Sequence, residues 1–277
     1  MDATPDWPPA PSAAPSEPRA WRFRSSDLFA RVPEVRQERV GRPAIWFFIW
    51  PAMILGFGMF GGLVAGLIYG FQVGMGMVAD TGGEDLMWYL HPMIAVANLA
   101  LLIFFWSWSS RRGMASAVMD FRARSWWRET GFGLLMLIVT IYAGGSLVTW
   151  MMQQIQQPVS PENIVPPEAG LALFLIALPG IVIIGPVIEE LIFRGWMLPA
   201  LKQRGMGWIG ALIVSSLAFG LLHVFAGPAS VAYTAVLGFT AGITRILSGR
   251  LWGAVLLHAL NNLFAISVPQ FLVTPPV

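Results

Sequence analysis

The chain has 277 residues, of which 56% are hydrophobic and 12% are charged, and its formal net charge is +2. A soluble globular domain carries about 25% charged residues, so this composition excludes an ordinary soluble domain and predicts a polytopic membrane protein. Cysteine is absent, which excludes disulfide bonds, cysteine-rich zinc sites and a cysteine nucleophile. Nothing in the sequence indicates nucleic-acid binding.

The first 43 residues differ from the rest of the chain. They are rich in proline, alanine and serine and then in arginine. This composition predicts a disordered cytoplasmic tail, with an interfacial helix over 25–37 as one option. No apolar run follows the basic residues at once, so we expect no cleavable signal peptide.

The remaining chain predicts an all-α transmembrane bundle of about seven helices, within a range of six to eight. Each apolar segment is close to the ~20 residues that a membrane helix needs. The predicted segments are 44–69, 86–108, 131–152, 170–193, 207–224, 231–247 and 252–268. We also expect the helix after 193 to continue to about Gln203 and to turn back at Gly205 and Gly207.

The basic residues predict the orientation of a multi-pass protein of the cell membrane. All 17 Lys and Arg residues fall in alternate connections, whereas 70–85 and 153–168 contain none. By the positive-inside rule, the N-terminus is expected in the cytoplasm and the C-terminus outside.

Three residue pairs, each with at least one polar member, interrupt the apolar sequence after residue 170 at a spacing of four residues. They are Glu190 with Arg194, Phe219 with His223, and His258 with Asn262, and Glu189 directly precedes the first pair. Residues four apart share one helix face. Polar groups are costly at membrane depth, so we expect the three faces to meet around an internal site.

The residue types in these pairs suit attack of water on an amide. A carboxylate such as Glu189 can act as general base, while Arg194 keeps Glu190 ionised and oriented. The histidines His223 and His258 can bind a metal or polarise a carbonyl. The amide of Asn262 can donate a hydrogen bond to a developing oxyanion.

The three motifs, EExxxR at Glu189–Arg194, FxxxH at Phe219–His223 and HxxxN at His258–Asn262, resemble those of the CPBP family of intramembrane proteases. That family includes the type II CAAX prenyl endopeptidases, which are Rce1-like, and bacteriocin-immunity-type proteins. The resemblance covers about residues 170–268 and implies a glutamate-dependent membrane protease.

The resemblance also implies roles for single residues. Glu189 would activate water, with Glu190 as a second catalytic residue beside it and His223, His258 and Asn262 around the scissile carbonyl, while Arg194 and Phe219 would support the site. Family members are commonly called metalloproteases, so a divalent metal, zinc for example, held by Glu189, His223 and His258 is a further expectation. The motifs leave open whether such a metal is required.

The predicted organisation is a tail at 1–43, a three-helix region at 44–169, a catalytic membrane domain at 170–268 and a short tail at 269–277. The expected substrates are membrane-associated or C-terminally lipidated, CAAX-like peptides or proteins. Two alternatives stay open. One is a non-enzymatic immunity or partner-binding membrane protein on the same scaffold. The other is an ion-coupled transporter, which the lack of polar residues in the first three segments disfavours.

Overall fold

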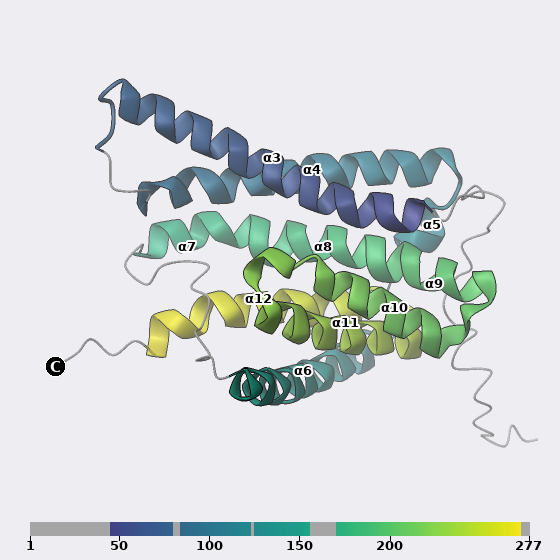
Figure 1. Ribbon diagram of the computed structural model, residues 1–277. Helices are drawn as coiled ribbons and strands as arrows, with labels where there is room; N and C mark the ends of the chain where they lie inside the picture. Colours follow the sequence, from purple (N-terminus) through teal and green to yellow (C-terminus); the bar gives the residue numbers. More distant parts are fainter. Residues whose placement is uncertain (1–44, 80–83, 123–124, 156–169, 273–277) are drawn as a thin grey trace, which may run out of the picture.

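The structure is a computed structural model, which describes residues 45–79, 84–122, 125–155 and 170–272. The tail predicted over 1–43 lies outside the described residues, and so does part of the tail predicted over 269–277. Every regular element of the described residues is helical (Figure 1).

The helices follow one another in a simple order. The first part of the chain forms α3 (Trp46–Gly74), α4 (Met87–Arg111), the short α5 (Ala115–Val118) and α6 (Trp126–Gln154). The second part forms α7 (Gly170–Leu178), α8 (Gly185–Glu190), α9 (Leu198–Leu201), α10 (Gly207–Leu221), α11 (Pro228–Ser248) and α12 (Trp252–Leu272). Three π-helical segments join α7 to α10, namely η3 (Pro179–Ile184), η4 (Leu191–Met197) and η5 (Lys202–Met206).

The described helices confirm a polytopic helical bundle. By length and composition, five helical stretches of the residues that the structure describes could cross a membrane, and the longest of them runs over Leu171–Leu221. That stretch reverses at Gly205 and Gly207, whose φ angles of 90° and 69° favour glycine. It therefore supplies two of the predicted segments, and the shorter apolar helix Trp252–Ser267 supplies the last. All seven predicted segments coincide with helices.

The helix of the fourth predicted segment, 170–193, continues past 193 to the turn at Gly205, close to the expected end at about Gln203. Its continuation is buried along nearly its whole length from Leu191 to Leu201, so packing holds it in place. Pro186 and Pro199 lie inside the helical stretch that begins at Gly170, and each removes a backbone donor. The π-helical segments beside them accommodate the loss with widened turns, which are frequent at functional sites.

The helices are arranged around α11 and α12. Helices α6 and α10 both pack on α11, while α12 packs on α6, on α11 and on η3. The hairpin of α3 and α4 lies to one side (Figure 1). Trp196 of η4 joins this hairpin to the rest, since its ring lies 5.1 Å from Phe47 and 5.9 Å from Trp108 between centroids.

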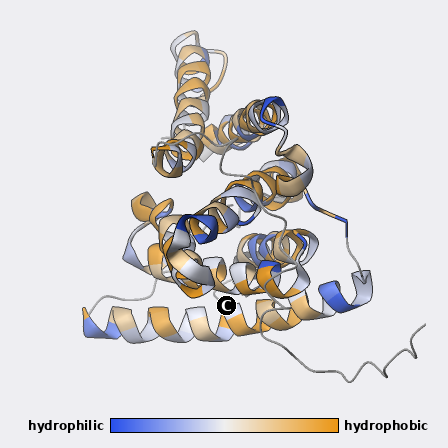
Figure 2. Ribbon diagram, turned by 90° about the vertical axis from the view of Figure 1, so that its right-hand side faces the viewer, coloured by the Kyte–Doolittle hydropathy of each residue, from blue (hydrophilic) through white to orange (hydrophobic). Residues whose placement is uncertain are grey.

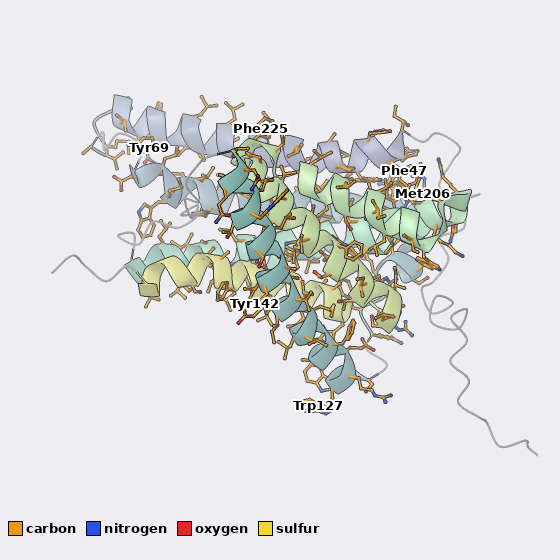
Figure 3. All side chains as sticks on the ribbon, turned by 60° about the horizontal axis from the view of Figure 1, so that its bottom comes forward. Phe47, Tyr69, Trp127, Tyr142, Met206 and Phe225 are labelled. Atoms are coloured by element: carbon orange, nitrogen blue, oxygen red, sulfur yellow. The ribbon has the colours of Figure 1, made fainter. Side chains whose placement is uncertain are left out.

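The outer surface of the bundle is apolar. Trp127, Tyr142 and Phe225 are each more than 70% exposed and project from the helices in Figure 3. In Figure 2, the lowest helix, α6, is hydrophobic along its middle and hydrophilic chiefly towards its ends. Such a surface suits contact with lipid rather than water, as expected of a multi-pass membrane protein.

Candidate active site

The first part of the site is a buried ion pair at the junction of α8 and η4. Glu190 is 0% exposed and Arg194 is 1% exposed. Nη1 of Arg194 donates to Oε1 of Glu190 over 3.0 Å, at the four-residue spacing that predicts their contact. Arg194 therefore compensates the charge of Glu190 instead of anchoring the helix at the membrane surface.

Helix α11 contributes a second hydrogen-bond acceptor for Arg194, the backbone carbonyl of Gly238. Nη2 of Arg194 donates to the carbonyl oxygen of Gly238 over 2.7 Å. A Cβ atom at this position would lie 3.0 Å from that Nη2 and 3.2 Å from Cδ1 of Phe219, so the close approach favours glycine. Sequence reasoning missed Gly238. The four-residue spacing between Gly238 and Gly242 is a signal of close helix packing that could have indicated it.

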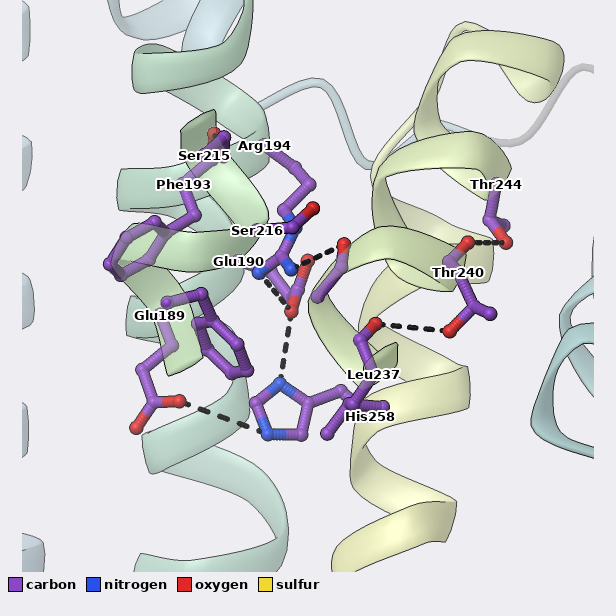
Figure 4. Close-up of polar contacts among 12 residues, drawn as sticks. Glu189, Glu190, Phe193, Arg194, Ser215, Ser216, Leu237, Thr240, Thr244 and His258 are labelled. Carbon is purple, nitrogen blue, oxygen red and sulfur yellow. Dashed lines mark hydrogen bonds and ion pairs between the residues drawn. The ribbon is translucent and has the colours of Figure 1, made fainter. Parts of the chain in front are cut away.

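His258 of α12 lies between the two glutamates (Figure 4). Its Nδ1 is 3.0 Å from Oε1 of Glu190, and its Nε2 is 3.8 Å from Oε2 of Glu189. An ionised Glu190 only accepts hydrogen bonds, so Nδ1 of His258 carries the hydrogen of this bond. The histidine ring is 2% exposed and meets Phe219 edge-on, at 5.4 Å between centroids.

The two glutamates have different surroundings. Glu190 is fully buried and bonded to both Arg194 and His258 through one oxygen, while its Oε2 is buried without a hydrogen-bond partner among the described residues. The side chain of Glu189 is 18% exposed. Glu190 thus holds the site together, and Glu189 is the carboxylate that a molecule from outside can reach.

His223 lies at the edge of this group. It follows the end of α10, is half-buried, and has its Nδ1 3.4 Å from the carbonyl oxygen of Phe219. The Phe219 ring is 5.5 Å from the ring of His223 and 5.4 Å from that of His258. Among the residues that the structure describes, no hydrogen bond or ion pair joins His223 to Glu189 or Glu190.

Asn262 lies one turn beyond His258 and points towards a different element. Its Nδ2 donates to the carbonyl oxygen of Ile181 in η3 over 2.9 Å. Its neighbour Asn261 accepts a hydrogen bond of 2.8 Å from the hydroxyl of Tyr233 on α11, which joins the two helices. The expected oxyanion contact of Asn262 stays a prediction.

The expected metal site does not fit the described geometry. No group of three or more His, Asp or Glu side chains in the described part of the chain could hold a metal ion. Of the proposed ligands, Glu189 and His258 face each other, whereas His223 contacts Phe219. No divalent metal, zinc included, therefore enters the chemistry derived below.

Comparisons with known proteins agree with the motifs. Residues 171–264, which contain all the site residues named above, match the family model described as "Type II CAAX prenyl endopeptidase Rce1-like". "Putative membrane peptidase YdiL" of Bacillus subtilis (strain 168) is 33% identical over 84 residues, which are 30% of this chain and 33% of that protein. The match thus spans about a third of the curated relative, and no solved structure matches. The resemblance is confirmed for residues 171–264, which are similar to the Rce1-like type II CAAX prenyl endopeptidases.

Proposed function

We propose that the protein is an intramembrane endopeptidase in which Glu189 activates the attacking water. The observation that carries this proposal is the placement of His258 between a buried, charge-compensated Glu190 and a partly exposed Glu189. A carboxylate that accepts a hydrogen bond from one ring nitrogen of a histidine fixes both the orientation of the ring and its tautomer. The free carboxylate beside it is then available as a general base.

The proposed reaction is hydrolysis of one peptide bond. Glu189 accepts a proton from water, and the water oxygen forms a bond to the carbonyl carbon. The carbon–nitrogen bond then breaks, and Glu189 returns the proton to the leaving amine. The products are a new carboxylic acid and a new amine, so no further reactant is needed.

His258 orients the water in this scheme. Because Glu190 accepts the hydrogen of Nδ1, the lone pair of Nε2 faces Glu189. The 3.8 Å between Nε2 and Oε2 of Glu189 exceeds a direct hydrogen bond, and one water can donate to both atoms. His223, half-buried at the edge, and Asn262 are the residues that we propose to lie near the substrate carbonyl.

The proposed substrates are membrane-anchored or C-terminally lipidated peptides. Glu189 and Glu190 lie on a helical stretch that is long and apolar enough to cross a membrane, and His258 lies on a shorter apolar helix. We therefore expect a substrate to reach the site from the bilayer or its interface. The matching family model is described by prenylated, CAAX-type substrates, which are lipidated at the C-terminus.

We also propose that the N-terminal end of α3 faces the cytoplasm. Arg112, after α4, and Arg204, before α10, stack on Trp46 and Phe47 at that end. Arg250, before α12, pairs with Asp120 there. Basic residues are concentrated on the cytoplasmic side of membrane proteins.

Cleavage by the purified protein tests the proposed function. We expect the protein in liposomes to cut a single-span peptide at an internal bond and to release two fragments. In ¹⁸O-labelled water, mass spectrometry should find one labelled oxygen in the new carboxyl group. Binding of the peptide without cleavage would contradict the proposal and favour the partner-binding alternative.

A further inference from the structure

We propose that Asp120 is a positioning residue for the site, acting through a segment that lies outside the family match. The clamp segment, residues 114–121, includes α5 and connects α4 towards α6. Residues 171–264 match the family model, so this segment belongs to the unmatched part of the chain. The inference rests on the proposed hydrolysis.

The clamp segment contacts the first half of the site through Val118. This residue is 0% exposed. A Cβ atom on Gly195 would lie 2.5 Å from the carbonyl oxygen of Val118 and 3.1 Å from its Cγ1. The backbones therefore touch directly after Arg194, the residue that pairs with Glu190.

The same segment contacts the second half of the site through Asp120. Its carboxylate pairs with Arg250, and its backbone oxygen accepts a hydrogen bond of 2.9 Å from the backbone of Leu251. Leu251 is 0% exposed and directly precedes α12. His258 follows seven residues later, about 10 Å along the helix.

The ion pair of Asp120 and Arg250 is largely shielded from water, so its attraction is weakened little by solvent. The side chains of Asp120 and Arg250 are 8% and 25% exposed. Arg245, which is 0% exposed, also interacts electrostatically with Asp120 and donates to the carbonyl oxygen of Gly249 over 2.7 Å. Asp120 thus fixes the turn between α11 and α12 from the side of the clamp segment.

The contacts of Val118 and Asp120 together fix the distance between the helix that carries Glu190 and the helix that carries His258. Glu190 and Arg194 lie on α8 and η4, which form one continuous helix that Val118 touches at Gly195. His258 lies on α12, whose start follows the Leu251 that Asp120 binds. The 3.0 Å bond between Glu190 and His258 spans them. A misplacement of about 1 Å can lower a catalytic rate by about a hundredfold, so a loosened clamp should act on the rate rather than on substrate binding.

Asp120→Asn keeps the side-chain shape and removes the charge. We expect kcat to fall about 10- to 100-fold with KM within about twofold of the wild type. Arg250→Gln should lower kcat as well, and the double variant should be no worse than Asp120→Asn alone, because that variant already lacks the ion pair. Arg122→Gln, on an exposed residue of the same connection, is the matched control and should change neither constant.

A distance measurement tests the clamp without relying on cleavage. The chain has no cysteine, so spin labels can be attached at Ile209→Cys on α10 and Phe264→Cys on α12, which are 74% and 46% exposed. Asp120→Asn and Arg250→Gln should each shift or broaden the distance distribution, and Arg122→Gln should not. If the wild type cleaves nothing, the proposed function fails. The distance measurement still tests whether Asp120 and Arg250 hold α12 in place.

Unchanged kcat and an unchanged distance distribution in both clamp variants would overturn the inference. A rise in KM at unchanged kcat would also overturn it, since the role would then lie in substrate binding. Should Asp120→Asn fail to insert, Arg250→Gln, which alters the more exposed partner, gives the same decision.

Discussion

Replacing Arg194 with methionine is expected to destabilise the folded protein by about 3–5 kcal/mol, the usual result of removing one partner from a buried ion pair. Glu190 would keep its charge at 0% exposure and would lose the donor at 3.0 Å. The carbonyl of Gly238 would lose its donor as well. Methionine is of comparable length and apolar, so the effect reports the lost charge and hydrogen bonds more than lost volume.

Unfolding in detergent micelles, followed by circular dichroism, measures this change. The matched control is Arg204→Met, an exposed arginine ten residues later, which should alter stability little. Combining Arg194→Met with Glu190→Leu should recover part of the loss, because both buried polar partners are then gone. Equal stability of Arg194→Met and the wild type would contradict the pairing.

Glu190→Gln is expected to lower the rate of cleavage by about 10³- to 10⁴-fold, by analogy with a triad that has lost its orienting carboxylate. A glutamine can present its amide hydrogens to Nδ1 of His258, which then becomes an acceptor. The ring would carry its hydrogen on Nε2, so it could no longer accept a hydrogen bond from the water beside Glu189.

Two measurements together test that expectation. The single-turnover rate reports the activity, and ¹⁵N NMR of labelled histidine reports which ring nitrogen carries the hydrogen. A variant that keeps its rate within about threefold and its Nδ1-protonated ring would show that Glu190 does not set the tautomer.

Local sequence patterns account for much of the fold and for part of the site. Hydropathy over about 20 residues located all seven helical segments, because a membrane helix satisfies its own backbone and buries apolar side chains. The four-residue spacing located the contact of Glu190 with Arg194 for a similar reason, since both residues lie on adjacent turns of one continuous helix.

Spacing alone could not predict the partners between helices. The π-helical segments before and after Glu189 add residues to their turns, and each added residue rotates the following helix face by about 100°. Spacing within one helix does not give such a rotation, so it could not indicate that Asn262 meets the carbonyl of Ile181 or that His258 meets Glu190.

Contacts between residues distant in sequence could not be predicted from the sequence either. Asp120 and Arg250 are 130 residues apart and belong to no shared motif. Their pairing depends on how α6, α11 and α12 pack, and no local rule gives that packing. A backbone carbonyl such as that of Gly238 also carries no side-chain signal of its role.

The single-turnover rate of Glu189→Gln on a membrane-anchored peptide tests the central claim most directly. This change leaves the contacts among Arg194, Glu190 and His258 in place, so the variant should insert and unfold like the wild type. We predict a rate about 10²- to 10⁴-fold lower, as expected for loss of a general base. Cleavage at the wild-type rate by a folded Glu189→Gln protein would contradict the account.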